Sequence, residues 1–326
     1  MNNKTILIAD IGGTNARFAI SSAESPYFFH DQILQCLDHA NLIEAIDSYL
    51  YQHNYKQLDA LCFAVAGPIK EEAMSFLNND WSLSADDLGA RYNTDSVVLM
   101  NDFQSISYSL AQLCDDDILN IGSRSAPSLG SDFTVGVIGP GSGLGIAGLR
   151  MQAGVSRPVA TEGGHIGFAP DSPLQIQILE YLQSEFGRVS NERLLSGPGL
   201  VNIHEALCII NKLDNPGISP ADIAVASREY SDPTCVQTMQ LFFEILGQVA
   251  GDTVLSLGAY DRIYIGGGIA QRYPNQLLRS AFRSGFENKG RYRTMMESVP
   301  SMLIMHQNPG LLGASFYANQ FLDVAE

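Results

Sequence analysis

Short apolar runs, each closed by a glycine or a carboxylate, dominate the first third of the chain. Residues 6–9 and 18–20 are two such runs, and between them lies Asp10-Ile11-Gly12-Gly13-Thr14-Asn15-Ala16-Arg17. Apolar runs on either side of a Gly-Gly pair predict a hairpin of buried strands. Residues 60–65 and 96–100 predict two more buried strands, and the second of these ends at Asn101-Asp102.

Helical spacing of apolar residues follows these runs. Residues 41–53 carry apolar side chains at helical intervals, and residues 104–113 carry Ile106 and Leu110 on one face, so both segments predict helices. The acidic triplet 115–117 and the stretch 122–131, rich in Ser, Gly and Pro, indicate a domain boundary.

The pattern of the opening hairpin returns after this boundary. Strands are predicted at 133–138 and 146–149, around the glycine turn Gly139-Pro140-Gly141-Ser142-Gly143-Leu144-Gly145. Two hairpins of one design, one in each half of the chain, predict a duplicated architecture with a cleft between the halves.

The rest of the second half is mainly helical. Apolar spacing predicts helices at 174–186, 200–212 and 241–257, and strands at 262–265 and 302–305. A closing helix at 311–322 is expected to cross back and pack on the first domain. Strands that alternate with helices indicate an α/β protein.

The charge balance argues against two classes of partner. Nineteen Lys and Arg residues against 35 Asp and Glu give a net charge of −16 with no basic stripe, so we expect binding to neither nucleic acid nor an anionic membrane. The sequence holds no apolar stretch long enough to span a bilayer, and residues 1–4 lack the apolar core of a signal peptide. Five scattered cysteines fit buried thiols in a reducing compartment, which favours the cytoplasm.

The first glycine turn has the groups that a nucleotide phosphate site needs. Gly12 and Gly13 let the backbone aim N–H groups at a phosphate, and Thr14 adds a hydroxyl. Asp10, fixed at a strand end, can hold Mg²⁺ through water. The same pattern also fits a plain tight turn, and these residues alone leave both interpretations open.

Three further segments carry candidate chemistry, each with a structural alternative. Asn101 and Asp102 follow a buried strand, where α/β sheets place ligands, but the pair also suits a helix N-cap. Glu162 and His165, separated by two glycines, can meet one small polar ligand or can belong to an exposed turn. Glu192 can serve a site or a capping box.

Two common nucleotide motifs do not occur in the sequence. It has no Gly-x-x-x-x-Gly-Lys-Ser/Thr run, and the turn at 139–145 does not open an obvious helix as a dinucleotide fingerprint does. A phosphate would therefore be held by backbone N–H groups of the two hairpins, together with Mg²⁺.

Seven blocks follow one another in a specific order. They are Asp10-Ile11-Gly12-Gly13-Thr14-Asn15-Ala16-Arg17, Asn101-Asp102-Phe103, Gly139-Pro140-Gly141-Ser142-Gly143-Leu144-Gly145, Glu162-Gly163-Gly164-His165, Leu195-Ser196-Gly197-Pro198-Gly199-Leu200, Gly266-Gly267-Gly268 and Asn308-Pro309-Gly310-Leu311-Leu312-Gly313. In this order they resemble the bacterial glucokinase family, within the superfamily of sugar kinases, actin and heat-shock chaperone ATPases. The resemblance spans residues 8–313.

The resemblance implies a role for each block. The ATP phosphates would lie on Ala9, Asp10, Ile11, Gly12, Gly13 and Thr14, under a loop formed by Gly139, Gly141, Ser142 and Gly143, with the adenosine beside Gly266, Gly267 and Gly268. The sugar hydroxyls would be held by Asn101, Asp102, Glu162, His165 and Glu192. Asp102 would act as the base for the 6-hydroxyl of glucose, with ATP and Mg²⁺ as cofactors and glucose 6-phosphate and ADP as products.

The resemblance also implies a two-domain, actin-like ATPase fold of duplicated ribonuclease H-like halves with an interdomain cleft. The small α/β domain would comprise residues 1–114 and 307–326, the large one residues 115–306, and the chain would form a homodimer. Where the family often has Thr-Asn-His-Thr-Trp, this chain has Leu77-Asn78-Asn79-Asp80-Trp81, with Asn78 a candidate sugar contact. The zinc-binding cysteine cluster of the related repressor and kinase family does not occur.

Two alternatives remain at this point. One is a related hexose kinase acting on mannose, fructose or N-acetylglucosamine. The other is a non-catalytic or chaperone-like ATPase, or a sugar-sensing regulator, which would keep the nucleotide loops but would need neither Asp102 nor Glu162 and His165. A DNA-binding regulator would also need a basic helix-turn-helix, for which residues 1–9 leave no room.

Overall fold

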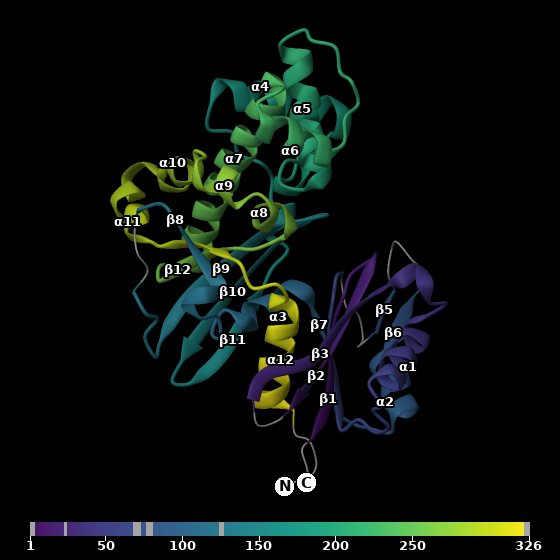
Figure 1. The fold of residues 1–326 in the computed structure, drawn as a ribbon. Helices are drawn as coiled ribbons and strands as arrows, with labels where there is room; N and C mark the ends of the chain where they lie inside the picture. The colour runs from purple at the N-terminus through teal and green to yellow at the C-terminus, as the bar shows by residue number, and fades with distance from the viewer. Residues whose placement is uncertain (1–3, 23–24, 68–72, 76–80, 124–126, 323–326) are drawn as a thin grey trace. The chain divides into compact units, whose positions relative to one another are not determined.

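Two α/β units make up the chain in the computed structural model, which describes residues 4–22, 25–67, 73–75, 81–123 and 127–322 (Figure 1). Unit 1 comprises Met1–Cys114, Pro158–Ala160 and His306–Glu326. Unit 2 comprises Asp115–Arg157 and Thr161–Met305. Each unit has its own sheet and its own apolar core.

Unit 1 is built on a mixed sheet with the strand order β3-β2-β1-β4-β7. Its strands are β1 (Thr5–Ile11), β2 (Asn15–Ser22), β3 (Ser25–Gln35), β4 (Ala60–Val65) and β7 (Val97–Asn101), and β5 (Ala73–Ser75) pairs separately with β6 (Ser82–Ser84). Its helices are α1 (Leu42–Gln52), α2 (Ala85–Tyr92), α3 (Asp102–Ser109) and α12 (Pro309–Phe321), with the 3₁₀ turn η1 (Cys36–Asp38).

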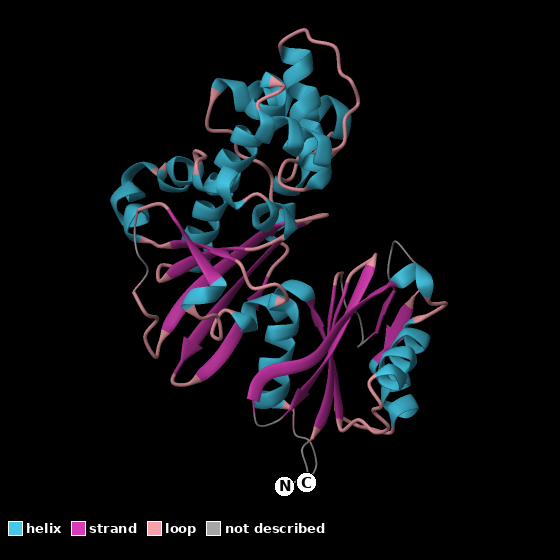
Figure 2. Cartoon of the chain, in the orientation of Figure 1, coloured by secondary structure: helices cyan, strands magenta, loops and turns pink. Residues whose placement is uncertain are grey.

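Helices cover both faces of this sheet (Figure 2). β1 is antiparallel to β2, with Ile8 opposite Ala19, and parallel to β4, with Ile8 beside Cys62. β4 is buried along its whole length, as expected for a central parallel strand with both faces covered. The closing helix α12 contacts β1 and α3, so it does pack back on the opening strands.

Unit 2 has a sheet with the strand order β11-β10-β9-β12-β13-β8. The strands are β8 (Ile118–Ile121), β9 (Phe133–Pro140), β10 (Leu144–Gln152), β11 (Val155–Ala160), β12 (Arg262–Ile265) and β13 (Ser301–Ile304). The helices are α4 (Pro173–Phe186), α5 (Gly197–Ile210), α6 (Pro220–Glu229), α7 (Pro233–Leu257), α8 (Gly268–Arg272), α9 (Pro274–Leu278), α10 (Phe282–Glu287) and α11 (Arg293–Ser298), with the 3₁₀ turns η2 (Asp115–Asp117), η3 (Gly163–His165), η4 (Asn191–Arg193) and η5 (Gly290–Tyr292).

The two sheets repeat one topology. β9 is antiparallel to β10, with Val137 opposite Ala147, and parallel to β12, with Val137 beside Tyr264. The order β11-β10-β9-β12-β13 therefore reproduces β3-β2-β1-β4-β7, and β8 adds an antiparallel edge strand. The predicted duplicated α/β architecture is confirmed.

Several element boundaries differ from the sequence-based expectation. α7 begins at Pro233, not at residue 241, because Asp232 caps it by accepting from the Thr234 and Cys235 N–H groups. The second glycine turn is shorter than expected, since Gly139 pairs with Gly145 inside the β9–β10 ladder. The strands β3 and β8 and the helices α2 and α6 were not predicted, because their apolar residues are few or are interrupted by polar ones.

The cysteines of the chain are mostly buried, as the sequence predicts. Cys36, Cys62, Cys208 and Cys235 are buried, as expected, whereas Cys114 is exposed. Burial raises the pKa of the Cys235 thiol to about 11, which keeps that thiol protonated. In the part of the chain that the structure describes, no helix is both long and apolar enough to cross a membrane.

Candidate active site

The first glycine turn lies at the carboxyl end of β1 and is fixed on both sides. The Gly12 N–H donates to the Asn15 carbonyl over 2.9 Å, which closes the turn between β1 and β2. The Cys36 N–H donates to the Thr14 carbonyl, also over 2.9 Å, which ties the turn to η1. The Thr14 side chain is exposed beside these glycines, so the hydroxyl and the turn are open to a ligand.

Asp10 is the last but one residue of β1 and lies against the start of α12. A Cβ atom at Gly310 would come within 2.8 Å of Asp10 Oδ2, so any larger residue there would displace the carboxylate. Across the hairpin, Arg17 Nη1 lies 3.7 Å from the same oxygen. Burial raises the pKa of Asp10, and the Arg17 guanidinium partly offsets this.

This arrangement fits Mg²⁺ held mainly by water and phosphate. Within the described ranges, no group of three or more His, Cys, Asp or Glu residues could hold a metal ion. A dedicated protein cage is not what Mg²⁺ requires, since it keeps several waters and takes one or two carboxylates together with substrate phosphates. The single carboxylate of Asp10 beside an open glycine turn meets that description.

The next strand ends carry Asn101 and Asp102 to the same edge of the sheet as Asp10. β1 is parallel to β4, and β4 is parallel to β7, with Val65 beside Asn101. Because parallel strands end at one edge, the Asp10 turn and Asn101-Asp102 share that edge. The structure thus brings together the predicted residues of unit 1.

Asn101, and not Asp102, is the N-cap of α3. Asn101 Oδ1 accepts from the N–H groups of Phe103 at 2.9 Å and Gln104 at 3.4 Å. Asp102 is the first helical residue, and its Oδ1 also accepts from the Phe103 N–H, at 2.8 Å. The structural alternative holds for Asn101, while the Asp102 carboxylate lies at a helix N terminus, where negative charge is stabilised.

α12 lies directly on α3 through the glycines of the last sequence block. Ser105 Oγ donates to the Gly310 carbonyl over 2.7 Å. A Cβ at Gly313 would overlap the Ser105 carbonyl oxygen. The block Asn308–Gly313 therefore positions both Asp10, through Gly310, and the helix that begins with Asp102.

In unit 2, Glu162, His165 and Glu192 converge. His165 Nε2 lies 3.9 Å from Glu162 Oε2, and His165 Nδ1 lies 3.9 Å from Glu192 Oε1. The side chains are 79%, 59% and 34% exposed for Glu162, His165 and Glu192. Both distances are longer than hydrogen bonds, so these three side chains are not hydrogen-bonded to one another and their exposed polar atoms are available to a ligand.

The glycines of this block seat the η3 turn on β10. A Cβ at Gly164 would overlap the Leu144 carbonyl oxygen, and one at Gly163 would lie 3.1 Å from the Ile146 side chain. Thr161 anchors the same turn, since its Oγ1 donates to the Ile146 carbonyl over 2.7 Å. The backbone is thereby pressed against the sheet, and Glu162 and His165 are directed outward.

Glu192 is not part of a capping box. Its Oε2 accepts from the Leu144 N–H over 2.9 Å, and a Cβ at Gly143 would lie 2.5 Å from the same oxygen. The second glycine turn, predicted to contact phosphates, therefore also positions Glu192, a residue predicted to bind a sugar. Sequence spacing gives no sign of this contact, because 48 positions separate Leu144 from Glu192.

Gly143→Ala is expected to raise the KM for a sugar substrate. A methyl group at this position displaces the Glu192 carboxylate. We therefore expect the KM to rise about tenfold or more, which is the effect of losing one charged hydrogen bond. Gly167→Ala is the matched control, because a Cβ there meets nothing within 4 Å. Steady-state kinetics with varied sugar measure the effect, and equal KM values for both variants would contradict this role of Gly143.

Three of the nucleotide residues predicted in unit 2, Gly141, Ser142 and Gly268, line one cavity. The Gly197 N–H donates to the Gly141 carbonyl over 2.8 Å, which joins α5 to the turn. Gly267 has φ +79°, and a Cβ there would overlap the Pro140 carbonyl, so the two glycine segments meet backbone to backbone. A cavity of 460 Å³ opens beside them, lined among others by Gly141, Ser142, Gly197, Gly268, Arg272 and Tyr273.

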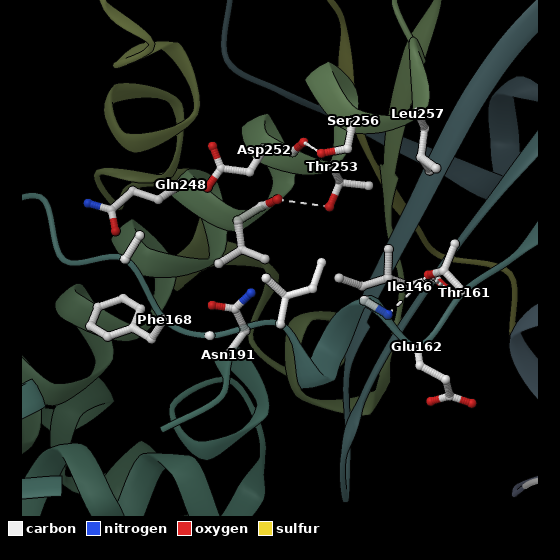
Figure 3. Close-up of a pocket in the computed structure, with 15 residues that line it drawn as sticks. Ile146, Thr161, Glu162, Phe168, Asn191, Gln248, Asp252, Thr253, Ser256 and Leu257 are labelled. Atoms are coloured by element: carbon white, nitrogen blue, oxygen red, sulfur yellow. Dashed lines mark hydrogen bonds between the residues drawn. The ribbon is translucent and has the colours of Figure 1, made fainter. Parts of the chain in front are cut away.

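A second cavity of 480 Å³ lies behind the η3 turn (Figure 3). Ile146, Val249 and Phe168 give it a mainly apolar lining. Figure 3 shows the Glu162 carboxylate pointing away from Gln248 and Asp252 on the far side of this cavity. The Glu162 carboxylate therefore faces away from this cavity, which lies on the other side of the η3 turn.

Not every predicted contact can be placed. Asn78 lies outside the described residues, together with Leu77, Asn79 and Asp80. Conversely, the sequence did not predict a role for three groups that position site residues: Arg17, Ser105 and the Leu144 N–H. Each of them acts through a partner in the folded chain. Arg17 alone had a signal, since its position opposite Asp10 follows from the register of a hairpin with a short turn.

Comparison with solved structures gives the class of protein. A glucokinase from an Antarctic psychrotroph superimposes with a TM-score of 0.86 and 31% identity, covering 96% of this chain and 98% of that one. A ROK family glucokinase from Streptomyces griseus, in complex with glucose and AMPPNP, gives a TM-score of 0.63 at 19% identity, with 97% and 99% covered. The fold is that of this class of sugar kinases.

Sequence comparison gives the family. The Glucokinase family model matches residues 7–321. The glucokinase of Xylella fastidiosa (strain 9a5c) is 38% identical over 320 residues, 96% of this chain and 94% of that protein. The glucokinase of Xanthomonas oryzae pv. oryzae (strain MAFF 311018) is 40% identical over 322 residues, 97% and 95% of the two chains. The chain belongs to the glucokinase family, which confirms the resemblance.

Proposed function

We propose that this chain transfers the γ-phosphate of ATP to the 6-hydroxyl of glucose and releases glucose 6-phosphate and ADP. The observation that carries the proposal is the convergence of Glu162, His165 and Glu192 on one exposed site, in a chain whose relatives at 38% and 40% identity are glucokinases. Two carboxylates and an imidazole offer the acceptors and donors that sugar hydroxyls need.

Asp102 supplies the base in this proposal. Phosphoryl transfer depends on positioning and charge more than on covalent chemistry, and a carboxylate that accepts the proton of the attacking hydroxyl orients the nucleophile. Asp102 is held at the first position of α3 and by the Phe103 N–H. Asn101 and the three residues of unit 2 would bind the other hydroxyls and so select which one reacts.

The glycine segments hold the nucleotide. The phosphates would lie on Ala9 to Thr14 of unit 1 and on Gly139, Gly141, Ser142 and Gly143 of unit 2, with the adenosine beside Gly266 to Gly268. The Gly12 and Gly141 N–H groups donate to the Asn15 and Gly143 carbonyls. These two glycines would therefore serve by letting the backbone come close, and Thr14 would add a hydroxyl. Mg²⁺, held through water by Asp10, would neutralise charge on the β- and γ-phosphates. The cavity of 460 Å³ beside Gly268 and Tyr273 is large enough for a ligand group of that kind.

Glu192→Gln is expected to weaken the hold on glucose without changing ATP binding. Losing the charge on one hydrogen-bonding partner corresponds to about a 10- to 100-fold rise in the glucose KM. Glu180→Gln, an exposed glutamate on α4, is the matched control. Initial rates at varied glucose and varied ATP separate the two constants, and a glucose KM equal to that of the control would refute the assignment.

A coupled ADP-release assay with glucose, mannose, fructose and N-acetylglucosamine tests the proposed function. Glucose is expected to give the highest kcat/KM. A higher kcat/KM with another hexose would mean that the chain is a related hexose kinase. ADP release no faster than in the absence of sugar would favour a sugar-sensing ATPase.

The family resemblance also supports a cytoplasmic homodimer acting in glycolysis, and sedimentation of the purified chain tests the dimer.

A further inference from the structure

A cavity of 530 Å³ in unit 2 lies apart from the residues assigned to glucose. The end of α6, the start of α7 and the helices α8 and α9 enclose it, and we call it the arginine cavity. Its polar lining includes Arg228, Tyr230, Arg272, Tyr273, Gln276 and Arg279. The volume is that of a site for a small metabolite.

The charge of this lining runs against that of the chain. The chain has 35 acidic and 19 basic side chains, yet the arginine cavity is lined by three arginines and by no Asp or Glu. Arg228 has a neighbouring carboxylate, with Nη2 3.8 Å from Glu229 Oε1. Over the described ranges, neither Arg272 nor Arg279 forms an ion pair with a carboxylate. Two guanidinium groups without a carboxylate partner, in one cavity with a third, are suited to a phosphate.

Side-chain amides add polar groups to the same lining. Gln240, Asn275 and Gln276 all line the arginine cavity. An amide offers both a donor and an acceptor, which suits the hydroxyl groups of an organic ligand.

The remaining wall of the arginine cavity suits the carbon skeleton of a phosphate ester. Val236, Met239 and Phe243 of α7 form an apolar part of the lining, and the rings of Tyr230 and Tyr273 flank it. Aromatic and apolar surfaces beside a few polar groups are typical of small-molecule sites.

We propose that the arginine cavity binds a hydroxyl-bearing phosphate ester of the size of a hexose phosphate. Its phosphate lies among Arg228, Arg272 and Arg279, and its hydroxyls meet the amides of Gln240, Asn275 and Gln276. The ester could reach the cavity from the reaction itself, as the product, or from another phosphorylated metabolite of like chemistry.

The arginine cavity shares a wall with the cavity assigned to the nucleotide. Arg272 and Tyr273 line both. A phosphate that engages Arg272 from one side withdraws its charge from the other, so the ester is expected to weaken nucleotide binding, and the nucleotide to weaken ester binding by the same factor. This coupling rests on the proposed function, whereas ester binding itself does not.

Calorimetric titration of the full chain tests the proposal. Glucose 6-phosphate, inorganic phosphate and glucose are titrated first into the free protein and then into protein saturated with glucose and AMPPNP. We expect one glucose 6-phosphate to bind per chain under the second condition, at least tenfold more tightly than inorganic phosphate. Titrating AMPPNP with and without the ester measures the coupling, and an unchanged AMPPNP affinity would overturn it.

Three variants make the result specific. Arg228→Gln combined with Arg279→Gln is expected to weaken the ester at least tenfold, while Arg150→Gln, an exposed arginine of β10, leaves it unchanged. Gln240→Met combined with Gln276→Met is expected to weaken the ester more than it weakens inorganic phosphate. No binding to the saturated protein, equal binding of inorganic phosphate, or binding insensitive to the double substitution would overturn the proposal. Failure of glucose and AMPPNP to bind would instead count against the proposed function.

Discussion

Asp102→Asn is expected to reduce turnover by about 10²–10⁴-fold, the usual contribution of general-base catalysis. The amide keeps the size of the side chain and can still accept the Phe103 N–H, which the carboxylate accepts at 2.8 Å. It cannot take the proton of the attacking hydroxyl. The glucose and ATP KM values are expected to change far less than kcat, which initial rates with both substrates varied will show.

The control is Asp86→Asn, since Asp86 lies in the first turn of α2, as Asp102 does in that of α3. Both variants should have the thermal midpoint of the parent protein. An Asp102→Asn variant that turns over glucose nearly as fast as the control would remove Asp102 from the role of base.

Gly313→Ala is the second change with a large expected effect. In an exposed helix interior this substitution stabilises by roughly 1 kcal/mol. Here the methyl group would overlap the Ser105 carbonyl oxygen, so we expect the opposite sign, a loss of about 3 kcal/mol in the free energy of unfolding. Urea denaturation measures this quantity.

The same substitution tests how α12 serves the site. Pushing Ser105 away moves the helix that starts at Asp102, and a misplacement of about 1 Å can cost on the order of 10² in rate. kcat is therefore expected to fall in the folded fraction as well. Gly268→Ala, where a Cβ meets nothing within 4 Å, is the control for stability, and a Gly313→Ala variant as stable as that control would contradict the contact.

The sequence was informative where local pattern and tertiary fold agree. Buried runs such as 60–65 became the central strand β4 with the expected bounds, because a parallel strand covered on both faces must be apolar throughout. The same pattern predicted the strand that ends at Asn101-Asp102, but the pairing that brings this pair to the edge of the Asp10 turn is seen only in the structure. The two glycine hairpins predicted the repeat that both sheets show.

The close approaches between distant segments could not be predicted. The residues around Glu192 allowed two interpretations, a site residue or a capping box. The contact that decides between them is with the Leu144 N–H, 48 positions away. Likewise, Gly310 precedes the predicted closing helix, but in the fold it belongs to the first turn of α12 and leaves room for the Asp10 carboxylate. Such positions are fixed by packing, for which spacing along the chain carries no signal.

The resemblance added what the residues themselves left open. Isolated, Glu162-Gly163-Gly164-His165 fits an exposed turn, and the structure does show both polar side chains exposed. It also shows why the glycines are needed, since Gly164 lies against the Leu144 carbonyl. An exposed turn and a binding turn would have the same structure here, so composition could not separate the two interpretations.

The most direct test of the account is the identity of the product. The purified chain, incubated with glucose, ATP and Mg²⁺, should form one phosphorylated sugar per ADP, and phosphorus NMR should show the phosphate on the 6-hydroxyl. ADP formed without a sugar phosphate, or a phosphate on any other hydroxyl, would contradict it.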